Sequence, residues 1–495
     1  MLQVDVTTGE ENTFEQLLDR TVRCALWLRK EGVKKGDVVA ISTHNHPDCF
    51  VPCIAALFIG VIFNPWDPGM NTNLARHFMR LTEPRVVFAN ERSTGVVLDA
   101  AKIEGFEPKM VTFGDYAGSL SFADILEGHP RSAMTSFRCE NVELGDTALI
   151  LFSSGTTGLP KGVELSHRMI LLNLVDNAAV HLTVMATPLW FSTLCWISGI
   201  LCNLKIFSTS ARKIIGPDFE PQKVCELVEK YKVTWLFLST SMANRLVRYE
   251  DLQKYDLSSL KCLFVGGAIL KQESQDMLRE YLPHALVAQG YGMTELGGAV
   301  ASQNPKSTSG SCGTVSINCE MKIVDVQTGK SLGPNQQGEL CVKSSTIMNG
   351  YHKNSTATKE ILDKDGWIHT GDLAYYNDQG EMFIVDRIKE IVKYRGYQIT
   401  PSVIEDLLQT HPGVVEVAVV GVPHPTDDEH LVAFVCKAAD TEVSANELIA
   451  KVENNFVDAY RLRGGVKFLS ALPYTATGKI ARAQLRNIAK SLAVH

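Results

Sequence analysis

The chain has 495 residues, of which 45% are hydrophobic and 21% are charged, and its formal net charge at pH 7 is −7. This composition is that of a folded globular protein and excludes a disordered or fibrous one, while the length predicts two or more domains. The small negative charge excludes a general attraction to nucleic acid or anionic lipid. We therefore expect no nucleic-acid partner and only local basic sites.

The cysteines and the chain ends predict the cellular compartment. Twelve cysteines are scattered singly, without a Cys-x-x-Cys motif or a His/Cys cluster at zinc spacing, which is typical of free thiols in a reducing compartment. Acidic residues follow the N-terminus, where a signal peptide would be basic, and the last residues are not the Ser-Lys-Leu peroxisomal address. Two long uncharged runs, 49–66 and 184–204, contain Pro, Gly and Asn, so we expect buried core and no membrane span. We expect a cytoplasmic location rather than a peroxisomal one.

The first 310 residues alternate between helical and strand patterns. Apolar residues at helical spacing predict a helix over 13–30, and a short apolar run predicts a strand over 38–42. This alternation predicts an α/β fold of parallel sheets covered by helices, with ligands bound at the strand ends. Further strands are expected over 86–89, 149–152, 233–239, 262–265 and 285–288, and helices over 221–231, 242–248 and 271–281.

The pattern changes after Gly313, where short strands are separated by Gly, Asn and Asp turns. We expect an antiparallel, barrel-like part over about 313–386, which completes a large N-terminal domain of residues 1–386. Residues 387–495 are predicted to form a small α+β C-terminal domain. The expected elements are strands over 320–325, 338–343, 366–370, 381–387, 414–420 and 431–437, and helices over 401–409, 445–456 and 480–492.

A stretch rich in hydroxyl groups and glycines, residues 152–167, lies between a predicted strand over 148–151 and a predicted helix over 169–174. Its hydroxyls and backbone N–H groups can donate to an anion and Lys161 adds a positive charge, so the pattern indicates a phosphate-binding loop. The Gly-Lys-Ser/Thr ending of a Walker A loop is absent, and a flexible surface turn is the alternative interpretation. The candidate phosphate-binding residues are Ser153, Ser154, Gly155, Thr156, Thr157, Gly158 and Lys161.

This stretch resembles the signature loop of the adenylate-forming superfamily, which includes acyl-CoA synthetases, 4-coumarate–CoA ligases, beetle luciferases and the adenylation domains of peptide synthetases. The resemblance implies that the loop holds the pyrophosphate end of ATP. It also implies an enzyme that uses ATP with Mg²⁺ and, in the ligase members, CoA. By the same resemblance, residues 1–386 would be the ATP- and acid-binding domain and residues 387–495 a mobile lid domain.

A second motif, Gln-Gly-Tyr-Gly-Met-Thr-Glu, offers an aromatic ring, a hydroxyl group and a carboxylate able to hold Mg²⁺. The resemblance implies that Tyr291 stacks on adenine, that Thr294 touches the α-phosphate and that Glu295 binds magnesium. Gly290 and Gly292 would let the flat ring approach closely. Tyr291 could equally be an ordinary core aromatic residue.

The tripeptide Thr370-Gly371-Asp372 supplies a carboxylate suited to bonding two ribose hydroxyls. The resemblance implies that Asp372 and Arg387 contact ribose and that Lys389 is the hinge of the C-terminal domain. A charged interdomain linker is the alternative interpretation around Lys389, and both can hold because hinges are linkers.

Two lysines of the predicted C-terminal domain are candidates for catalysis. Lys479 follows a Thr-Gly turn, and the resemblance implies that it bridges the acid and the α-phosphate during adenylation. Lys393 and Gly396 lie on the edge that the family brings to the active site for thioester formation with CoA. An exposed surface position without a catalytic role is the alternative for Lys393.

Small and apolar residues indicate where the acid would bind. A pocket with apolar, small-residue walls would suit a fatty or aryl acid, although the same residues could be ordinary core. The candidate lining residues are Trp190, Phe191, Gly266, Gly267, Ala268, Gly290 and Gly298.

Together these motifs predict an AMP-forming acid–CoA ligase whose partners are a small carboxylic acid, ATP and CoA. The alternatives are a luciferase-like oxygenase and a catalytically silent acyl- or nucleotide-binding paralogue. Luciferases carry a histidine-containing segment where this chain has residues 188–192 without one, and an arginine where it has Asn173. A silent paralogue would need a broken motif, and the charged motif residues are all present. The chain ends soon after Lys479 without a carrier domain, so free CoA is the expected acceptor.

Overall fold

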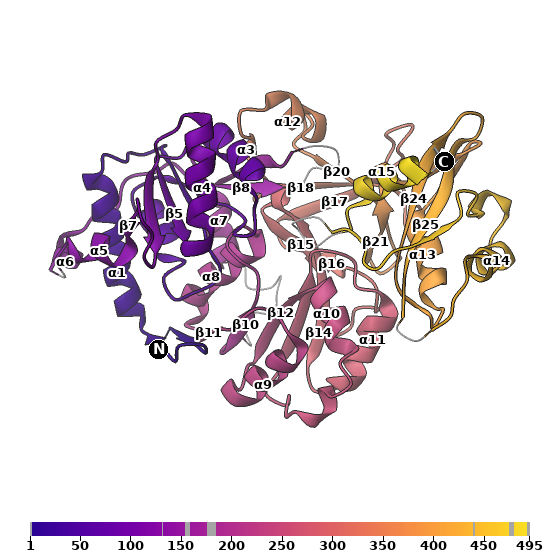
Figure 1. Cartoon of the computed structure of the whole chain (residues 1–495), viewed down its shortest axis with the longest axis horizontal. Coiled ribbons are helices and arrows are strands. Elements are labelled where there is room, and N and C mark those ends of the chain that lie inside the picture. The colour runs from indigo at the N-terminus through magenta and orange to yellow at the C-terminus, as the bar shows by residue number, and fades with distance from the viewer. Residues whose placement is uncertain are drawn as a thin grey trace. The chain divides into compact units, whose positions relative to one another are not determined.

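The computed structural model describes residues 2–130, 132–153, 159–175, 185–438, 441–474 and 480–492. The chain forms two compact units, Met1–Glu320 with Val342–Ile368 and Met321–Cys341 with His369–His495 (Figure 1). The first contains largely parallel sheets with intervening helices and the second is a smaller unit of strands and helices, which confirms the predicted α/β fold class. The domain boundary after residue 386 stays a prediction.

An eight-stranded sheet of the first unit carries the predicted phosphate-binding segment. In spatial order its strands are β19 (Gly350–Tyr351), β9 (Lys161–Ser166), β8 (Thr147–Ser153), β4 (Ile62–Pro65), β3 (Val38–Ser42), β5 (Val86–Asn90), β6 (Lys109–Phe113) and β7 (Leu120–Ser121). The strands from β8 to β7 pair in parallel, whereas β9 and β19 extend the edge in antiparallel fashion. The predicted strand over 38–42 is confirmed.

Helices accompany this sheet along the chain. They are α1 (Phe14–Lys30), α2 (Val51–Phe58), α3 (Thr72–Thr82), α4 (Glu91–Glu104), α5 (Phe122–Glu127), α6 (Ala133–Ser136) and α7 (His167–Val175). α1 begins at a capping box in which Thr13 and Gln16 exchange hydrogen bonds, and it buries Leu17, Val22 and Leu28. The predicted helix over 13–30 is therefore confirmed.

The second sheet of this unit supplies most of the remaining motif residues. Its strands, in order, are β16 (Thr314–Val315), β15 (Gly298–Ser302), β14 (Leu286–Met293), β13 (Cys262–Gly266), β12 (Trp235–Ser239), β10 (Pro188–Trp190), β11 (Lys213–Ile215), β1 (Gln3–Asp5) and β2 (Glu11–Asn12). The strands from β14 to β1 are parallel, and β2, β15 and β16 are antiparallel to their neighbours. The helices between them are α8 (Ile197–Thr209), α9 (Pro221–Tyr231), α10 (Thr240–Val247) and α11 (Gln272–Tyr281).

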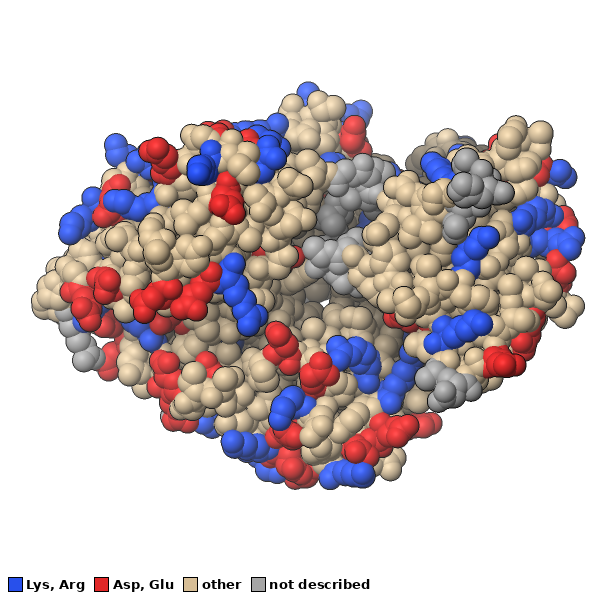
Figure 2. All heavy atoms as spheres, in the orientation of Figure 1, with Lys and Arg blue, Asp and Glu red and all other residues tan. Residues whose placement is uncertain are grey.

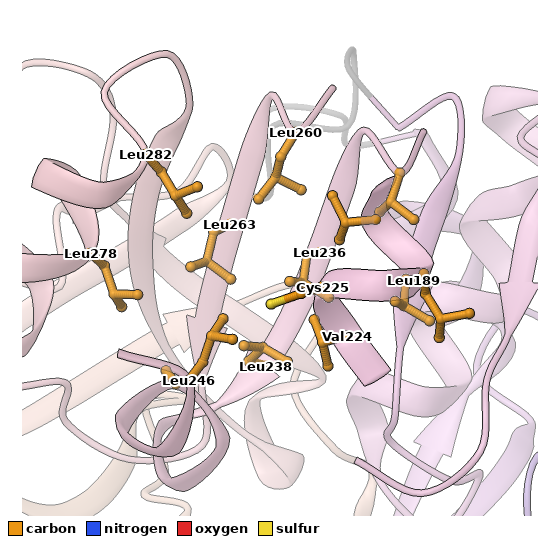
Figure 3. Close-up of a cluster of buried hydrophobic side chains, with 14 of the residues drawn as sticks. Leu189, Val224, Cys225, Leu236, Leu238, Leu246, Leu260, Leu263, Leu278 and Leu282 are labelled. Carbon is orange, nitrogen blue, oxygen red and sulfur yellow. The ribbon is translucent and has the colours of Figure 1, made fainter. Parts of the chain in front are cut away.

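One apolar core joins these strands to their helices. Figure 3 shows Leu236 and Leu238 of β12 lying close to Val224 and Cys225 of α9, with Leu263 of β13 beside them. Burial of a side chain of this size contributes about 1.5–3 kcal/mol. The core therefore fixes the strand ends at which the predicted acid-binding residues lie.

The two long uncharged runs are core elements of these sheets. Residues 49–66 include α2 and β4, and residues 184–204 include β10 and much of α8. Within the part of the chain that the structure describes, no helix is both long enough and apolar enough to cross a membrane.

The second unit contains two further sheets. A four-stranded sheet has the order β17 (Cys319–Val324), β18 (Gly338–Ser344), β20 (Ile368–Tyr376) and β21 (Met382–Arg387), with most of its residues in this unit. A five-stranded sheet comprises β23 (Tyr397–Ile399), β22 (Val392–Tyr394), β25 (Asp428–Lys437) and β24 (Val414–His424), with β26 (Val466–Phe468) beside β25. Its helices are α13 (Pro401–Gln409), α14 (Ala445–Asn455) and α15 (Arg482–Leu492), while α12 (Ser355–Ile361) belongs to the first unit.

A buried ion pair anchors α15, which begins three residues after Lys479. Arg482 contacts Glu405 of α13 through both terminal nitrogens, at 2.5 and 3.0 Å, and also donates to the carbonyl oxygen of Val419 in β24. Glu405 accepts a further hydrogen bond from the backbone N–H of Val419. Both charged groups have partners, which is the condition under which a buried ion pair is tolerated.

Three local expectations around the motifs are wrong in detail, because strand pairing extends beyond the apolar runs. The phosphate-binding loop does not lead directly into a helix, since β9 lies between them and pairs with β8 and β19. The strand expected over 366–370 continues through Asp372 as β20, which pairs with β21. The strand expected over 285–288 runs on to Met293 as β14, and a 3₁₀ turn, η3 (Thr294–Leu296), follows it.

Two glycines of that motif are required by the packing of β15 against β14. A Cβ on Gly292 would lie 2.2 Å from the carbonyl oxygen of Gly298, and a Cβ on Gly290 would lie 2.8 Å from the carbonyl oxygen of Ala301. The pairing also shifts register between Tyr291 and Gly292. Close backbone approach of this kind is what glycine in a strand permits.

We expect Gly292→Ala to lower the free energy of unfolding by about 2 kcal/mol or more, because the backbone oxygen of Gly298 must move to admit the methyl group. Gly145→Ala is the matched control, since a Cβ there meets no atom within 4 Å, and it should change the free energy by less than about 0.5 kcal/mol. Urea unfolding followed by circular dichroism measures both. Equal midpoints for the two variants would contradict the packing argument.

Candidate active site

The antiparallel pair of β8 and β9 fixes both ends of the predicted phosphate-binding loop. Ser153, the last residue of β8, lies opposite Lys161, the first residue of β9. The register thus brings a hydroxyl group and an ammonium group to the two ends of one short loop, as phosphate binding requires. The loop residues Ser154, Gly155, Thr156, Thr157 and Gly158 lie outside the described residues.

A tyrosine links this hairpin to the predicted magnesium ligand. The Nζ atom of Lys161 lies 4.7 Å from the centre of the Tyr351 ring, within the range of a cation–π contact. The Tyr351 hydroxyl donates a hydrogen bond to Oε1 of Glu295 at 2.9 Å. Lys161, Tyr351 and Glu295 therefore form one connected group inside the first unit.

Glu295 is the buried acid of this group. It lies on η3 and is 5% exposed. Among the described residues, Oε1 has the Tyr351 hydroxyl as its donor and Oε2 has no hydrogen-bond partner. A buried carboxylate is costly without compensation, and Mg²⁺ is bound in proteins by one or two carboxylates together with water and phosphate oxygens. The residues present therefore fit a magnesium ion held jointly with nucleotide phosphates.

Sequence reasoning missed Tyr351. Its segment, Asn-Gly-Tyr-His, has the composition of a turn, and no local pattern marks the ring as a partner of Glu295. Tyr351 forms the two-residue strand β19 opposite Val163 of β9, and the N–H of Met348 donates to the carbonyl oxygen of Glu295. The alternation of residues in β9 was the usable signal, because it would have revealed the strand on which β19 pairs.

The remaining residues of the second motif lie around the same turn. Tyr291 is half-buried in β14 opposite Ala301, and Thr294 opens η3 directly before Glu295. The structure thus brings the candidate adenine, phosphate and magnesium residues of this motif onto one strand end. Their contacts with a nucleotide stay predictions.

Asn173 fastens α7 to the turn that follows Glu295. Its Nδ2 donates to the carbonyl oxygens of Met169 at 3.0 Å and Gly297 at 3.1 Å. Gly298 has φ of +135°, and a Cβ there would lie 3.3 Å from Oδ1 of Asn173. Asn173 and Gly298 therefore pack directly against each other.

Two candidate acid-binding aromatics lie at the end of β10. Trp190 is 2% exposed, its indole nitrogen has no hydrogen-bond partner among the described residues, and Nζ of Lys213 lies 4.9 Å from its ring centre. Burial lowers the pKa of Lys213, whose ammonium donates to Oδ1 of Asn203 at 2.9 Å. Phe191 meets Phe219 edge to face, with ring centres 5.4 Å apart. Both aromatics are packed by neighbouring side chains, and their contact with an acid stays a prediction.

Three other candidate acid-binding residues, Gly266, Gly267 and Ala268, lie at the end of β13. Gly266 ends the strand, Gly267 is exposed with φ of +94°, and the carbonyl oxygen of Ala268 accepts from the Thr240 hydroxyl at 2.7 Å. The carboxyl ends of parallel strands are where ligands bind in sheets of this type. The end of β13 is therefore compatible with the predicted acid-binding position, because Gly266 and Gly267 have no side chains that would obstruct a ligand.

In the second unit, the two residues predicted to contact ribose lie opposite each other in β20 and β21. Nε of Arg387 lies 2.7 Å from Oδ1 of Asp372, whose side chain is only 5% exposed. The backbone N–H of Asp372 donates to Oγ1 of Thr370 at 3.1 Å. The structure thus brings Asp372 and Arg387 together and fixes the orientation of the carboxylate.

The predicted hinge and thioester residues lie further along the second unit. Lys389 is exposed on the 3₁₀ turn η4 (Ile388–Glu390), and Lys393 is exposed on β22, where its backbone N–H donates to Oε2 of Glu429 at 2.9 Å. Gly396, with φ of +81°, follows Arg395 in the two-residue turn between β22 and β23. Positive φ at both turn residues is the mark of a type I′ hairpin. Lys479 lies outside the described residues.

Charges of both signs are mixed on the surface. Figure 2 shows Lys and Arg side chains interspersed with Asp and Glu over the face in view. Among the residues coloured there, this face has no broad basic surface that would attract nucleic acid or anionic lipid.

Comparison with known proteins identifies the family. The model of the AMP-binding enzyme family matches residues 3–352, and that of the AMP-binding enzyme C-terminal domain matches residues 403–479. The chain is 32% identical over 503 residues to 4-coumarate–CoA ligase 4 of Arabidopsis thaliana, covering 98% of this chain and 87% of that protein. It is 31% identical over 504 residues to luciferin 4-monooxygenase of Nipponoluciola cruciata, covering 98% and 91%.

The fold has a counterpart among solved structures. The crystal structure of ATP-bound MatB from Rhodopseudomonas palustris superposes with a TM-score of 0.90 at 24% identity, covering 99% of this chain and 96% of that one. The first family model matches well over half of the chain, and the alignments with the relatives cover 98% of it. The chain therefore belongs to the AMP-binding family of adenylate-forming enzymes, in which acid–CoA ligases and luciferin 4-monooxygenases are its relatives.

Proposed function

We propose that the chain is an AMP-forming acid–CoA ligase that activates a fatty or aryl carboxylic acid with ATP and Mg²⁺ and transfers the acyl group to CoA. The observation that carries the proposal is the connected group of Lys161, Tyr351 and Glu295. It places a cation from the predicted phosphate-binding hairpin and a buried carboxylate on one tyrosine. The relatives named as 4-coumarate–CoA ligases support the same chemistry.

In the first half-reaction, a carboxylate oxygen of the acid attacks the α-phosphorus of ATP. The bond between the α-phosphorus and pyrophosphate breaks, and an acyl-adenylate forms. Both reactants are anionic, so the barrier consists mainly of charge repulsion and positioning. Lys161 and the loop donors would bind the departing pyrophosphate, and Lys479 would hold the acid against the α-phosphate. A magnesium ion on Glu295 would supply further charge compensation.

In the second half-reaction, the CoA sulfur attacks the acyl carbon and AMP departs, while the thiol proton is released. The hairpin that carries Lys393 and Gly396 presents an exposed ammonium group near a turn position, Gly396, at which a Cβ would meet no atom within 4 Å. We assign this hairpin to thioester formation. The predicted hinge at Lys389 would let Lys479 and the hairpin act in turn.

The proposal is tested by measuring pyrophosphate release from ATP and Mg²⁺ against a panel of acids, from short to long fatty acids and hydroxycinnamic acids, with and without CoA. We expect turnover with one class of acid and CoA-dependent formation of AMP and a thioester. Silence across the panel with ATP still bound would favour the silent paralogue. Oxygen consumption after adenylation, without thioester formation, would favour the oxygenase.

The two lysines are expected to separate the half-reactions. Lys479→Ala should slow pyrophosphate release by at least about a hundredfold, because a group that stabilises developing charge is lost. Lys393→Ala should leave pyrophosphate release near the wild-type rate in single turnover and slow thioester formation by about a hundredfold. Lys451→Ala on α14 is the control for removing a lysine from the same domain. Normal pyrophosphate release by Lys479→Ala would overturn the assigned role.

Tyr351→Phe is expected to weaken the binding of Mg²⁺ to the enzyme–ATP complex by about tenfold to a hundredfold, because the carboxylate of Glu295 loses the donor that orients it. The concentration of Mg²⁺ at half-maximal pyrophosphate release measures the effect. Tyr376→Phe is the matched control, since the one hydrogen bond of the Tyr376 hydroxyl to a described residue is a 3.5 Å contact with the carbonyl oxygen of Leu332. If both variants require the same Mg²⁺ concentration as the wild type, Tyr351 does not position Glu295.

A further inference from the structure

Two imidazoles and a carboxylate gather at the tip of the hairpin formed by β24 and β25. His424 is the last residue of β24, Asp427 lies in the connecting turn, and His430 is the third residue of β25. One ligand atom from each residue lies within 4.8 Å of the other two. None of the three residues belongs to the motifs that predict the adenylation chemistry.

The strand register explains why the two histidines meet. His424 lies opposite Asp428, and His430 lies two residues further along β25. Side chains two residues apart on a strand share a face, so His424 and His430 are diagonal neighbours on one side of the hairpin. Their rings stack with centres 3.7 Å apart and an interplanar angle of 16°.

The third ligand is aimed at both rings. Oδ2 of Asp427 lies 2.8 Å from Nε2 of His430 and 3.5 Å from Nδ1 of His424. Ligand atoms of a tetrahedral Zn²⁺ site with bonds of 2.0–2.1 Å are separated by roughly 3.3 Å. The two oxygen–nitrogen distances lie on either side of that separation. The stacked rings must turn out of parallel for the lone pairs of both nitrogens to point at one ion, and the exposure of His424 leaves room for that rotation.

The second oxygen of the carboxylate has a separate partner. Nε of Arg395 lies 2.7 Å from Oδ1 of Asp427, on the opposite side of the carboxyl group from the oxygen that faces the histidines. Outer partners of this kind orient metal ligands. The Asp427 side chain is 8% exposed and His424 is 36% exposed, which leaves an approach for an ion and water beside His424.

We propose that His424, Asp427 and His430 form a binding site for a divalent transition-metal ion of the Zn²⁺ and Co²⁺ class, distinct from the magnesium assigned to Glu295. Two imidazole nitrogens and one carboxylate oxygen are the donor set that such ions prefer, whereas Mg²⁺ selects oxygen ligands. Three protein ligands leave a position for water. Binding replaces the proton that Nε2 of His430 shares with Asp427.

The sequence analysis found no His/Cys cluster at zinc spacing. That search does not detect this group, because the residue between the two histidines that completes it is an aspartate. The residues are spaced three apart across a hairpin tip, a pattern that acquires meaning only when the register is known. The proposal goes beyond the ligase activity and does not depend on it.

A second group in the same unit provides the matched control. Ligand atoms of Glu339, Cys341 and His369 also lie within 4.8 Å of one another. There, Nδ1 of His369 contacts both Oε2 of Glu339 at 2.8 Å and Sγ of Cys341 at 3.5 Å. Nδ1 of His369 is thus shared by Glu339 and Cys341. A metal ion bound at this group would have the thiolate of Cys341 as a ligand, which distinguishes it from the hairpin site.

The test is titration of the metal-free full chain with Co²⁺ in the absence of nucleotide, followed by visible absorption. We expect one equivalent of Co²⁺ to bind in the micromolar range with nitrogen and oxygen ligand bands. His430→Gln and, separately, His424→Gln should each weaken binding by at least about tenfold. His369→Gln should bind Co²⁺ as the wild type does. Unchanged thermal midpoints of the variants without metal show that the hairpin is still folded.

Three results would overturn the proposal. The first is the absence of Co²⁺ binding by the wild type in the micromolar range. The second is equal affinity in the wild type and in both hairpin variants. The third is a sulfur-to-cobalt charge-transfer band that disappears in His369→Gln, which would place the ion at the group containing Cys341.

Discussion

The hydrogen bond between the Tyr351 hydroxyl and the buried carboxylate of Glu295 is the contact on which the candidate site depends. It joins β19 to the turn after β14, and Tyr351 simultaneously packs under the ammonium group of Lys161. Removing the hydroxyl would leave Glu295 buried without a donor among the described residues, which is costly for a charged group. The positions of the predicted phosphate-binding lysine and magnesium ligand are therefore coupled through one side chain.

The same contact explains why a carboxylate can be buried here at all. Within the chain, Glu295 is compensated by a neutral hydroxyl and by a cation that lies beyond the tyrosine ring, and neither neutralises it as an ion pair would. A bound cation would complete the compensation. In the proposed reaction that cation is the magnesium ion.

Much of the fold could be predicted from the sequence, because periodicity reports burial directly. The helix bounds of α9 and α13 and the strand bounds of β3 follow from apolar spacing alone. The prediction failed at β9, because Lys161 and Gly162 at its start have the composition of a loop and conceal the alternation of the residues that follow them. It failed again at β19, whose two residues are a strand only because β9 lies beside them. Edge pairing is a tertiary effect that a local pattern does not contain.

For the candidate site, the sequence identified individual residues but not how they lie relative to one another. Asp372 and Arg387 were found separately, but their position opposite each other depends on the register of β20 and β21. Gly290 and Gly292 were attributed to the approach of a flat ligand, whereas backbone atoms of β15 already require them. A glycine in a motif thus has two possible physical causes, and only the neighbouring strand distinguishes them.

Asn173, which stands where luciferases carry an arginine, is packed against the turn that follows Glu295. Asn173 uses both amide hydrogens on the carbonyl oxygens of Met169 and Gly297, so it keeps no donor for a ligand on that side. Gly298 packs against Asn173 and Leu201, and a longer side chain there would collide with both. A polar residue at position 298 could be accommodated only if Asn173 changed as well. The contact between Asn173 and Gly298 therefore restricts the side chains that both positions can hold together.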